Sequence, residues 1–135
     1  MVQKIMRNSK SKVYIEALRK FRKVIPLIKS INDVTNISSD KVLYIVKELL
    51  EGLMLLKGVN PPSSLDLTNV AAFALDHKVI NPKQFALIAE LNVACRSMRL
   101  TKKYSKLYEE IVHELLKLAN EIDPYVSLDA EIFRY

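Results

Sequence analysis

The sequence is poor in the residues that build disulfides, tight turns and metal sites. It contains one cysteine, Cys95, two glycines and no tryptophan among its 135 residues. A single cysteine excludes an internal disulfide and a zinc site built from several cysteines. Two isolated glycines cannot form a phosphate-binding glycine loop, and sheet proteins with many tight turns usually contain more glycine. These absences favour an all-α protein, for which we expect no metal and no cofactor.

Long apolar segments are also missing. The longest uninterrupted apolar run covers residues 70–75, far short of the roughly 20 residues that a transmembrane helix needs. Residues 1–12 are basic but lack the apolar stretch of a secretory signal. We therefore expect a cytoplasmic protein with no membrane partner.

The residues that are present suit a helical bundle. Half are hydrophobic and 27% are charged, as in a folded globular domain. Apolar residues recur at helical spacing. They predict five helices. Four cover residues 11–30, 65–76, 82–100 and 102–122, and the second runs from a cap at Ser39 or Asp40 to Gly58. Short connections between them favour antiparallel neighbours, so the expected fold class is an all-α, up-down helical bundle of about five helices.

Local signals set the ends of these helices. Pro26 should kink the first helix or end its regular part, because proline lacks the backbone N–H. Ser39 or Asp40 can cap the second helix, and Gly58 closes it. Asn81 followed by proline is a start signal for the fourth helix. The expected division is a flexible basic N-terminus over 1–10, a bundle over 11–123 and a C-terminal tail over 124–135, which packs as a short turn or docks on a partner.

The second predicted helix is apolar around almost its full circumference at residues 53–56. A helix of this kind lies between other helices or at an oligomer interface. The pattern alone does not separate these two placements.

Positive charge is distributed unevenly along the chain. The net charge is +6, yet residues 1–30 contain nine Lys or Arg and one acid, Glu16. Residues 96–106 contain five basic residues and no acid, whereas the segment from Leu107 onward contains seven acids and two basic residues. Such polarity suits binding to a polyanion or an acidic protein. The alternative is a solvated face that acids elsewhere balance.

A phosphate-binding surface is predicted around the end of the fourth helix and the start of the fifth. Arginine forms bidentate phosphate contacts, lysine adds point charge and an aromatic ring can stack on a base. The candidate residues are Arg96, Arg99, Lys102, Lys103 and Tyr104. Tyr104 and Tyr108 also fit the apolar stripe of the fifth helix, so core packing is the alternative for at least one of them.

The remaining chemistry-bearing residues favour structural roles. His77 falls in a polar turn and His113 on the flank of the fifth helix, and neither has a nucleophile nearby in the sequence. Cys95 is expected to be a small core residue. Glu110 and Glu114 share a helix face but lack further metal ligands, so a solvated acidic face is the expected reading.

The order of these features resembles a HEPN domain, in particular the toxin-type HEPN partner of minimal nucleotidyltransferases. The family motif is an arginine, often followed by asparagine, then four to six variable residues, a histidine and a tyrosine shortly after. The matching stretch here runs from Arg96 to Tyr104. Ser97 stands where asparagine is common, and Thr101 stands where the nearest histidine belongs.

The resemblance implies a homodimer in which Arg96 of each subunit faces a shared cleft, with a nucleotidyltransferase as a further partner. Without the histidine, acid–base catalysis lacks the side chain that titrates near neutral pH. The leading hypothesis is therefore a HEPN-like binding module, without catalysis, that contacts RNA, nucleotide or a partner protein through a basic surface. One alternative is an endoribonuclease toxin of a toxin-antitoxin pair that uses Arg96 as a catalytic residue. Another is a small structural subunit of a CRISPR ribonucleoprotein effector.

Overall fold

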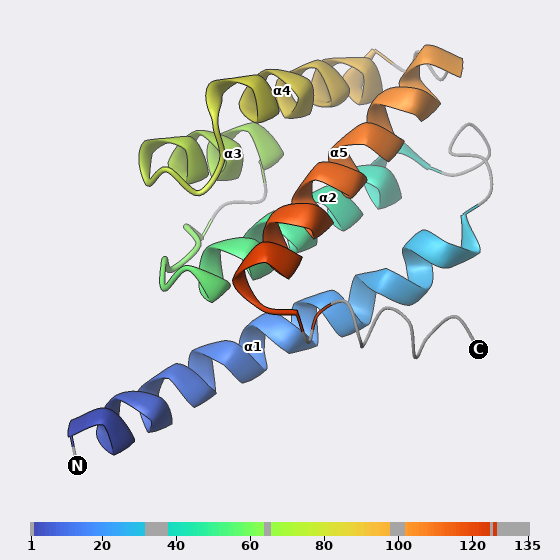
Figure 1. Ribbon diagram of the computed structural model, residues 1–135. Coiled ribbons are helices and arrows are strands. Elements are labelled where there is room, and N and C mark those ends of the chain that lie inside the picture. Colours follow the sequence, from blue (N-terminus) through green and yellow to red (C-terminus); the bar gives the residue numbers. More distant parts are fainter. Residues whose placement is uncertain (1, 32–37, 64–65, 98–101, 125, 127–135) are drawn as a thin grey trace.

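The computed structural model is an all-α bundle, as the sequence predicts (Figure 1). It describes residues 2–31, 38–63, 66–97, 102–124 and 126, including their side chains except those of residues 2–11 and 102. Five helices make up this part of the chain, and no strand occurs in it. They are α1 (Val2–Ser30), α2 (Ser39–Leu56), α3 (Leu67–Asp76), α4 (Pro82–Arg96) and α5 (Lys102–Ile122).

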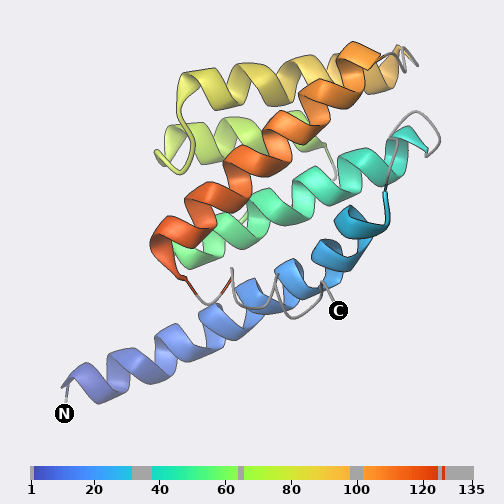
Figure 2. The same cartoon turned by 45° about the vertical axis from the view of Figure 1, so that its right-hand side comes forward.

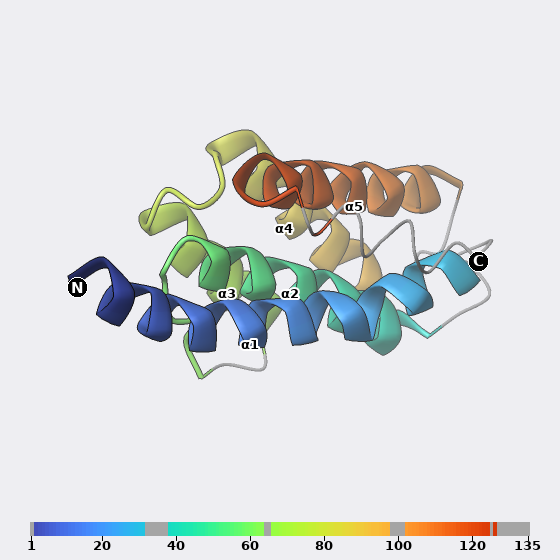
Figure 3. The same ribbon diagram turned by 60° about the horizontal axis from the view of Figure 1, so that its bottom comes forward.

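Helix α2 lies at the centre of the bundle. It contacts α1, α3, α4 and α5, whereas α3 packs chiefly on α4 and α2. Figure 2 shows α5 lying across α2 and α4, and Figure 3 shows α1 alongside α2 on the other side. The N-terminal part of α1 extends beyond the other helices in all three views. Among the described residues, α1 therefore packs chiefly on α2 and keeps one long face exposed.

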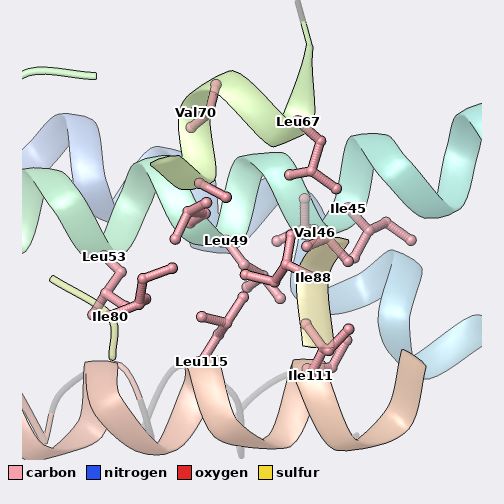
Figure 4. Packing of buried hydrophobic residues seen from close by; sticks show 14 of the residues in the cluster. Ile45, Val46, Leu49, Leu53, Leu67, Val70, Ile80, Ile88, Ile111 and Leu115 are labelled. Carbon is pink, nitrogen blue, oxygen red and sulfur yellow. The ribbon is translucent and has the colours of Figure 1, made fainter. Parts of the chain in front are cut away.

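The central position of α2 explains its apolar circumference. Leu53, Met54 and Leu55 point in different directions around the helix, and all three are buried. Figure 4 shows α2 side chains meeting those of α3, α4 and α5 in one continuous core. The chain's own helices therefore cover this surface, which settles the question in favour of a core helix over an oligomer interface for these residues.

Gly52 brings α1 and α2 close together. A Cβ atom at this position would lie 2.9 Å from Cε2 of Phe21, whose ring is buried against α2. Real Cβ atoms do not approach a ring carbon that closely, so any larger residue requires the Phe21 ring to move. The close packing of α1 on α2 therefore depends on glycine, which has no side chain, at position 52.

The start of α4 is as predicted, whereas the N-cap of α2 lies one residue before the predicted ones. Asn81 accepts a hydrogen bond from the Gln84 N–H at 2.8 Å, and Gln84 accepts one from the Asn81 N–H at 2.9 Å, which forms a capping box. The cap of α2 is Ser38, which accepts from the Lys41 N–H at 3.2 Å, and not Ser39 or Asp40. Three successive residues can cap a helix equally well, so the sequence does not choose between them.

The first helix is longer than predicted. It begins at Val2, whereas the apolar spacing predicts a start near residue 11 and a flexible segment before it. Residues 2–11 contain neither glycine nor proline, so nothing in them stops a helix from continuing. Pro26 lies within α1, which continues to Ser30 and so does not end near residue 25. The predicted end of the fourth helix near residue 100 and most of the C-terminal tail lie outside the described residues.

Helices α2 and α3 end in the same hydrogen-bonded motif. After α2, the Val59 N–H donates to the Met54 carbonyl at 2.9 Å, and Gly58 adopts a φ of 75°. After α3, the Val79 N–H donates to the Ala74 carbonyl at 2.9 Å, but the left-handed position is Lys78, with a φ of 60°. This is the Schellman arrangement, which glycine adopts without the steric cost of a Cβ atom.

Candidate functional site

Arg96 lies at the last turn of α4, and its side chain is 65% exposed. One guanidinium nitrogen lies 3.2 Å from Oδ1 of Asp66, the residue that caps α3. The same carboxylate oxygen accepts from the Thr68 N–H at 3.2 Å. An exposed ion pair of this kind contributes little stability.

The other predicted phosphate-binding residues do not form a single described cluster with Arg96. Lys103 is 88% exposed, and its ammonium lies 4.0 Å from the Glu90 carboxylate of α4. Lys102 begins α5, but the structure does not describe its side chain, and Arg99 lies outside the described residues. Of the predicted surface, the structure therefore places Arg96 and Lys103, each beside an acidic residue.

Tyr104 is a core residue and not a surface contact. It is 2% exposed, and its hydroxyl lies 2.7 Å from Sγ of Cys95, which is also buried. Desolvation and the bond to Cys95 both raise the Tyr104 pKa above its usual value. The ring cannot stack on a base, so its inclusion in the nucleic-acid surface is corrected, whereas the predictions of core packing for Tyr104 and Cys95 are confirmed.

The two histidines lie on the surface of the described structure. Nδ1 of His77 lies 2.9 Å from the Phe73 carbonyl, and its ring stacks on the Phe73 ring with centroids 4.2 Å apart. His113 is exposed on α5. Neither is among the residues described around the groove beside Arg96. Nothing in the described structure therefore supplies an imidazole to act with this guanidinium.

The groove beside Arg96 has a volume of about 240 Å³. Helix α2 contributes Asp40, Tyr44 and Lys47 to its lining, and Asp66 and Arg96 also line it. Tyr44 is 39% exposed, which makes it the most exposed aromatic side chain among the large hydrophobic residues described. An aromatic ring, an amine and a guanidinium thus share one concave surface, which the sequence does not reveal because the residues come from separate helices.

A second candidate surface is the outer face of α1. Helix α1 carries nine basic residues and one acid, a net charge of +8, whereas the rest of the chain carries twelve basic and fourteen acidic residues, a net charge of −2. The face opposite the core is exposed. Its described basic residues are Lys12, Arg19, Arg22, Lys23 and Lys29. We call this set the basic face of α1.

An ion-pair network connects α1 to the groove. The Lys20 ammonium lies 3.0 Å from Glu48 and 3.1 Å from Oε1 of Glu51, and Lys47 lies 3.3 Å from Oε2 of Glu51. Burial opposes the charge on Lys20, but the hydrogen bonds and attraction of the two carboxylates outweigh it and raise the Lys20 pKa. One carboxylate therefore joins a side chain of α1 to a side chain that lines the groove.

No known protein family, curated protein or solved structure matches this chain. None of the described helices has both the length and the hydropathy of a bilayer span. Among the described residues, no three His, Cys, Asp or Glu side chains gather where they could bind a metal ion.

Proposed function

We propose that this chain is a HEPN-like, non-catalytic module that binds RNA through the basic face of α1. The observation that carries the proposal is the division of charge, with +8 on α1 and −2 on the rest of the chain. Phosphate contacts dominate the affinity of nucleic-acid-binding proteins and are largely independent of sequence. A single exposed helix with almost no acidic residue is suited to such contacts.

The geometry of α1 favours nucleic acid over a membrane surface. Basic amphipathic helices bind membranes by inserting their apolar face. The apolar face of α1 is occupied, because Ala17, Phe21 and Val24 are buried against the bundle. The surface that remains is mainly charged and spans Lys12 to Lys29, about 25 Å at a rise of about 1.5 Å per residue. It can follow a row of backbone phosphates.

The surroundings of Arg96 favour binding without cleavage. Its described partner is the carboxylate of Asp66, which accepts a hydrogen bond from the Thr68 N–H at the α3 N-terminus, and not an imidazole. The five-helix order and the position of Arg96 at the end of α4 support the HEPN-like proposal. A homodimer and a nucleotidyltransferase partner belong to the same proposal and follow from the resemblance.

The test is RNA binding by a triple variant, Lys12→Gln, Arg19→Gln and Lys23→Gln. Binding of a labelled single-stranded RNA is measured by fluorescence anisotropy between about 50 and 200 mM salt. The native chain should bind at low salt and leave the RNA intact on a denaturing gel. The triple variant should bind more weakly. Its slope of log Kd against log salt concentration should be smaller by about 2, since each of the three lost phosphate contacts contributes roughly 0.7.

The matched control removes the same charge elsewhere, with Lys57→Gln, Lys83→Gln and Lys117→Gln on exposed positions of other segments. Its net charge equals that of the α1 variant, so any difference between the two reflects location. Equal loss of binding in both variants, or no binding by the native chain at low salt, would refute the α1 surface. If the native chain cleaves the RNA and the Arg96→Ala variant does not, the result would instead support the alternative function as an endoribonuclease.

A further inference from the structure

We propose that the groove beside Tyr44 takes one unpaired nucleobase, so that the nucleic acid held by α1 is single-stranded. Binding of a base is inferred from the residues that line the groove. The link between the groove and a bound strand rests on the proposed RNA-binding function.

The size of the groove matches a small planar group. Its volume of about 240 Å³ lies below the roughly 300–1,000 Å³ of sites for drug-sized ligands. Leu43 and Leu67 contribute apolar surface, and Tyr44 adds a half-exposed aromatic ring. Stacking on an aromatic ring suits any of the four bases, because each has a π-face. The flat apolar face of a nucleobase can pack against these three side chains.

The charge of the groove favours a neutral group over a phosphate. The described part of its lining contains two acidic residues, Asp40 and Asp66, and two basic residues, Lys47 and Arg96, whose formal charges cancel. Lys47 is already 3.3 Å from Glu51, and Arg96 is 3.2 Å from Asp66. A base can accept hydrogen bonds from Lys47 and Arg96 through its ring nitrogens and carbonyls. It can also donate to Asp40 from an amino group.

Two of the side chains that line the groove are held in place by hydrogen bonds. Asn92 is buried, and its amide donates to the Thr68 hydroxyl at 2.7 Å, which ties α4 to α3. Asp66 is held by the Thr68 N–H at the start of α3. Because these groups are positioned by the fold, little side-chain freedom is lost when a base enters, and pre-organisation of this kind favours binding.

The groove lies one side chain away from α1. Glu51 contacts Lys47 of the groove with one oxygen and Lys20 of α1 with the other. Lys23 follows Lys20 by one turn on the exposed side of the same helix. A strand whose phosphates contact the basic face of α1 can therefore place one base in the groove, whereas a duplex keeps its bases paired and stacked inside.

The direct test uses free nucleosides, which carry no phosphate and so do not depend on α1. Adenosine, guanosine, cytidine and uridine at millimolar concentration should shift the NMR ring resonances of Tyr44, which the Tyr44→Phe variant identifies. The shifts should persist in the α1 triple variant and disappear when Tyr44→Ala removes the ring. Deoxynucleosides added in parallel decide between RNA and DNA as the source of the base.

The second test uses whole strands and separates the two proposals. Tyr44→Ala should weaken binding of an unstructured single-stranded RNA by about 5- to 150-fold, the loss expected for one stacked base. Tyr44→Phe should bind as the native chain does, and duplex affinity and the salt dependence should not change in either variant. Ile122→Ala serves as the control, because Ile122 is exposed to the same extent as Tyr44.

The outcomes distinguish the failures. RNA binding by the native chain that is unchanged in Tyr44→Ala, together with unshifted Tyr44 resonances, overturns the groove proposal and leaves α1 intact. Nucleoside-induced shifts without any RNA binding at low salt support the groove and overturn the function proposed for α1. Equal affinity for duplex and single strand also overturns the proposal of a single-stranded partner.

Discussion

Two buried tyrosines, one turn apart on α5, should respond in opposite ways to the same substitution. Tyr104 and Tyr108 are 2% and 4% exposed. The Tyr104 hydroxyl lies 2.7 Å from Sγ of Cys95, whereas the Tyr108 hydroxyl has no hydrogen-bond partner among the described residues. Replacing either residue by phenylalanine removes one oxygen atom and keeps the ring. Only the bonding of that oxygen differs between the two sites.

The expected magnitudes follow from the cost of burying a polar group. A buried hydroxyl without a partner costs about 1–3 kcal/mol, so Tyr108→Phe should raise the free energy of unfolding by about 1–2 kcal/mol. A made hydrogen bond contributes about 0.5–1.5 kcal/mol, and a thiol is a weak partner, so Tyr104→Phe should lower it by about 0.5–1 kcal/mol. The two variants should therefore lie on opposite sides of the native chain.

Urea unfolding followed by circular dichroism measures both changes. With a slope of about 2 kcal/mol per molar urea, the midpoint should rise by about 0.5–1 M in Tyr108→Phe and fall by about 0.3–0.5 M in Tyr104→Phe. The slopes themselves should not change. A lower midpoint for Tyr108→Phe would contradict this prediction, because it would mean that the hydroxyl has a stabilising partner.

Two further predictions follow from the same structure. Stability should fall as pH rises from about 10 towards 12, because a tyrosine whose folded pKa exceeds its unfolded value stabilises the fold only while it is protonated. Burial raises the Tyr108 pKa to about 12 and also raises the Tyr104 pKa. Absorbance and circular dichroism recorded together should show that these two tyrosines ionise as the protein unfolds. Lys78→Gly should raise the unfolding free energy by roughly 0.5–1 kcal/mol, because it relieves a left-handed backbone at φ 60°, and an unchanged or lower Tm in calorimetry would contradict this.

The sequence predicts those parts of the fold that depend on neighbours along the chain. Apolar spacing locates the five helices. The groups that form the start signal of α4, from Asn81 to Gln84, lie within four successive residues. The early start of α1 escapes prediction because a helix without a breaker has no local signal for where it begins. Helix positions are therefore readable from the sequence, but the outer ends of an exposed helix are not.

The candidate site is less predictable because its contacts join distant segments. Arg96 and Asp66 are 30 residues apart, and Lys20 lies 28 residues from Glu48. The groove depends on α2, α3 and α4 meeting, which no spacing within one helix reveals. The segment charge of residues 1–30 is visible in the sequence, but its exposure on one face follows only from the packing of α1. Tyr104 shows the converse, because its neighbours in sequence are basic and its neighbours in space are apolar.

The unequal division of charge between α1 and the remaining helices gives the molecule a strong electric dipole. A polyanion therefore exerts a torque on the protein before any side chain touches it. In dilute salt, where the screening length is about 30 Å at 0.01 M, the protein should rotate during its approach so that α1 leads. Orientation during diffusion, and not only contact area, would then set the rate at which productive complexes form.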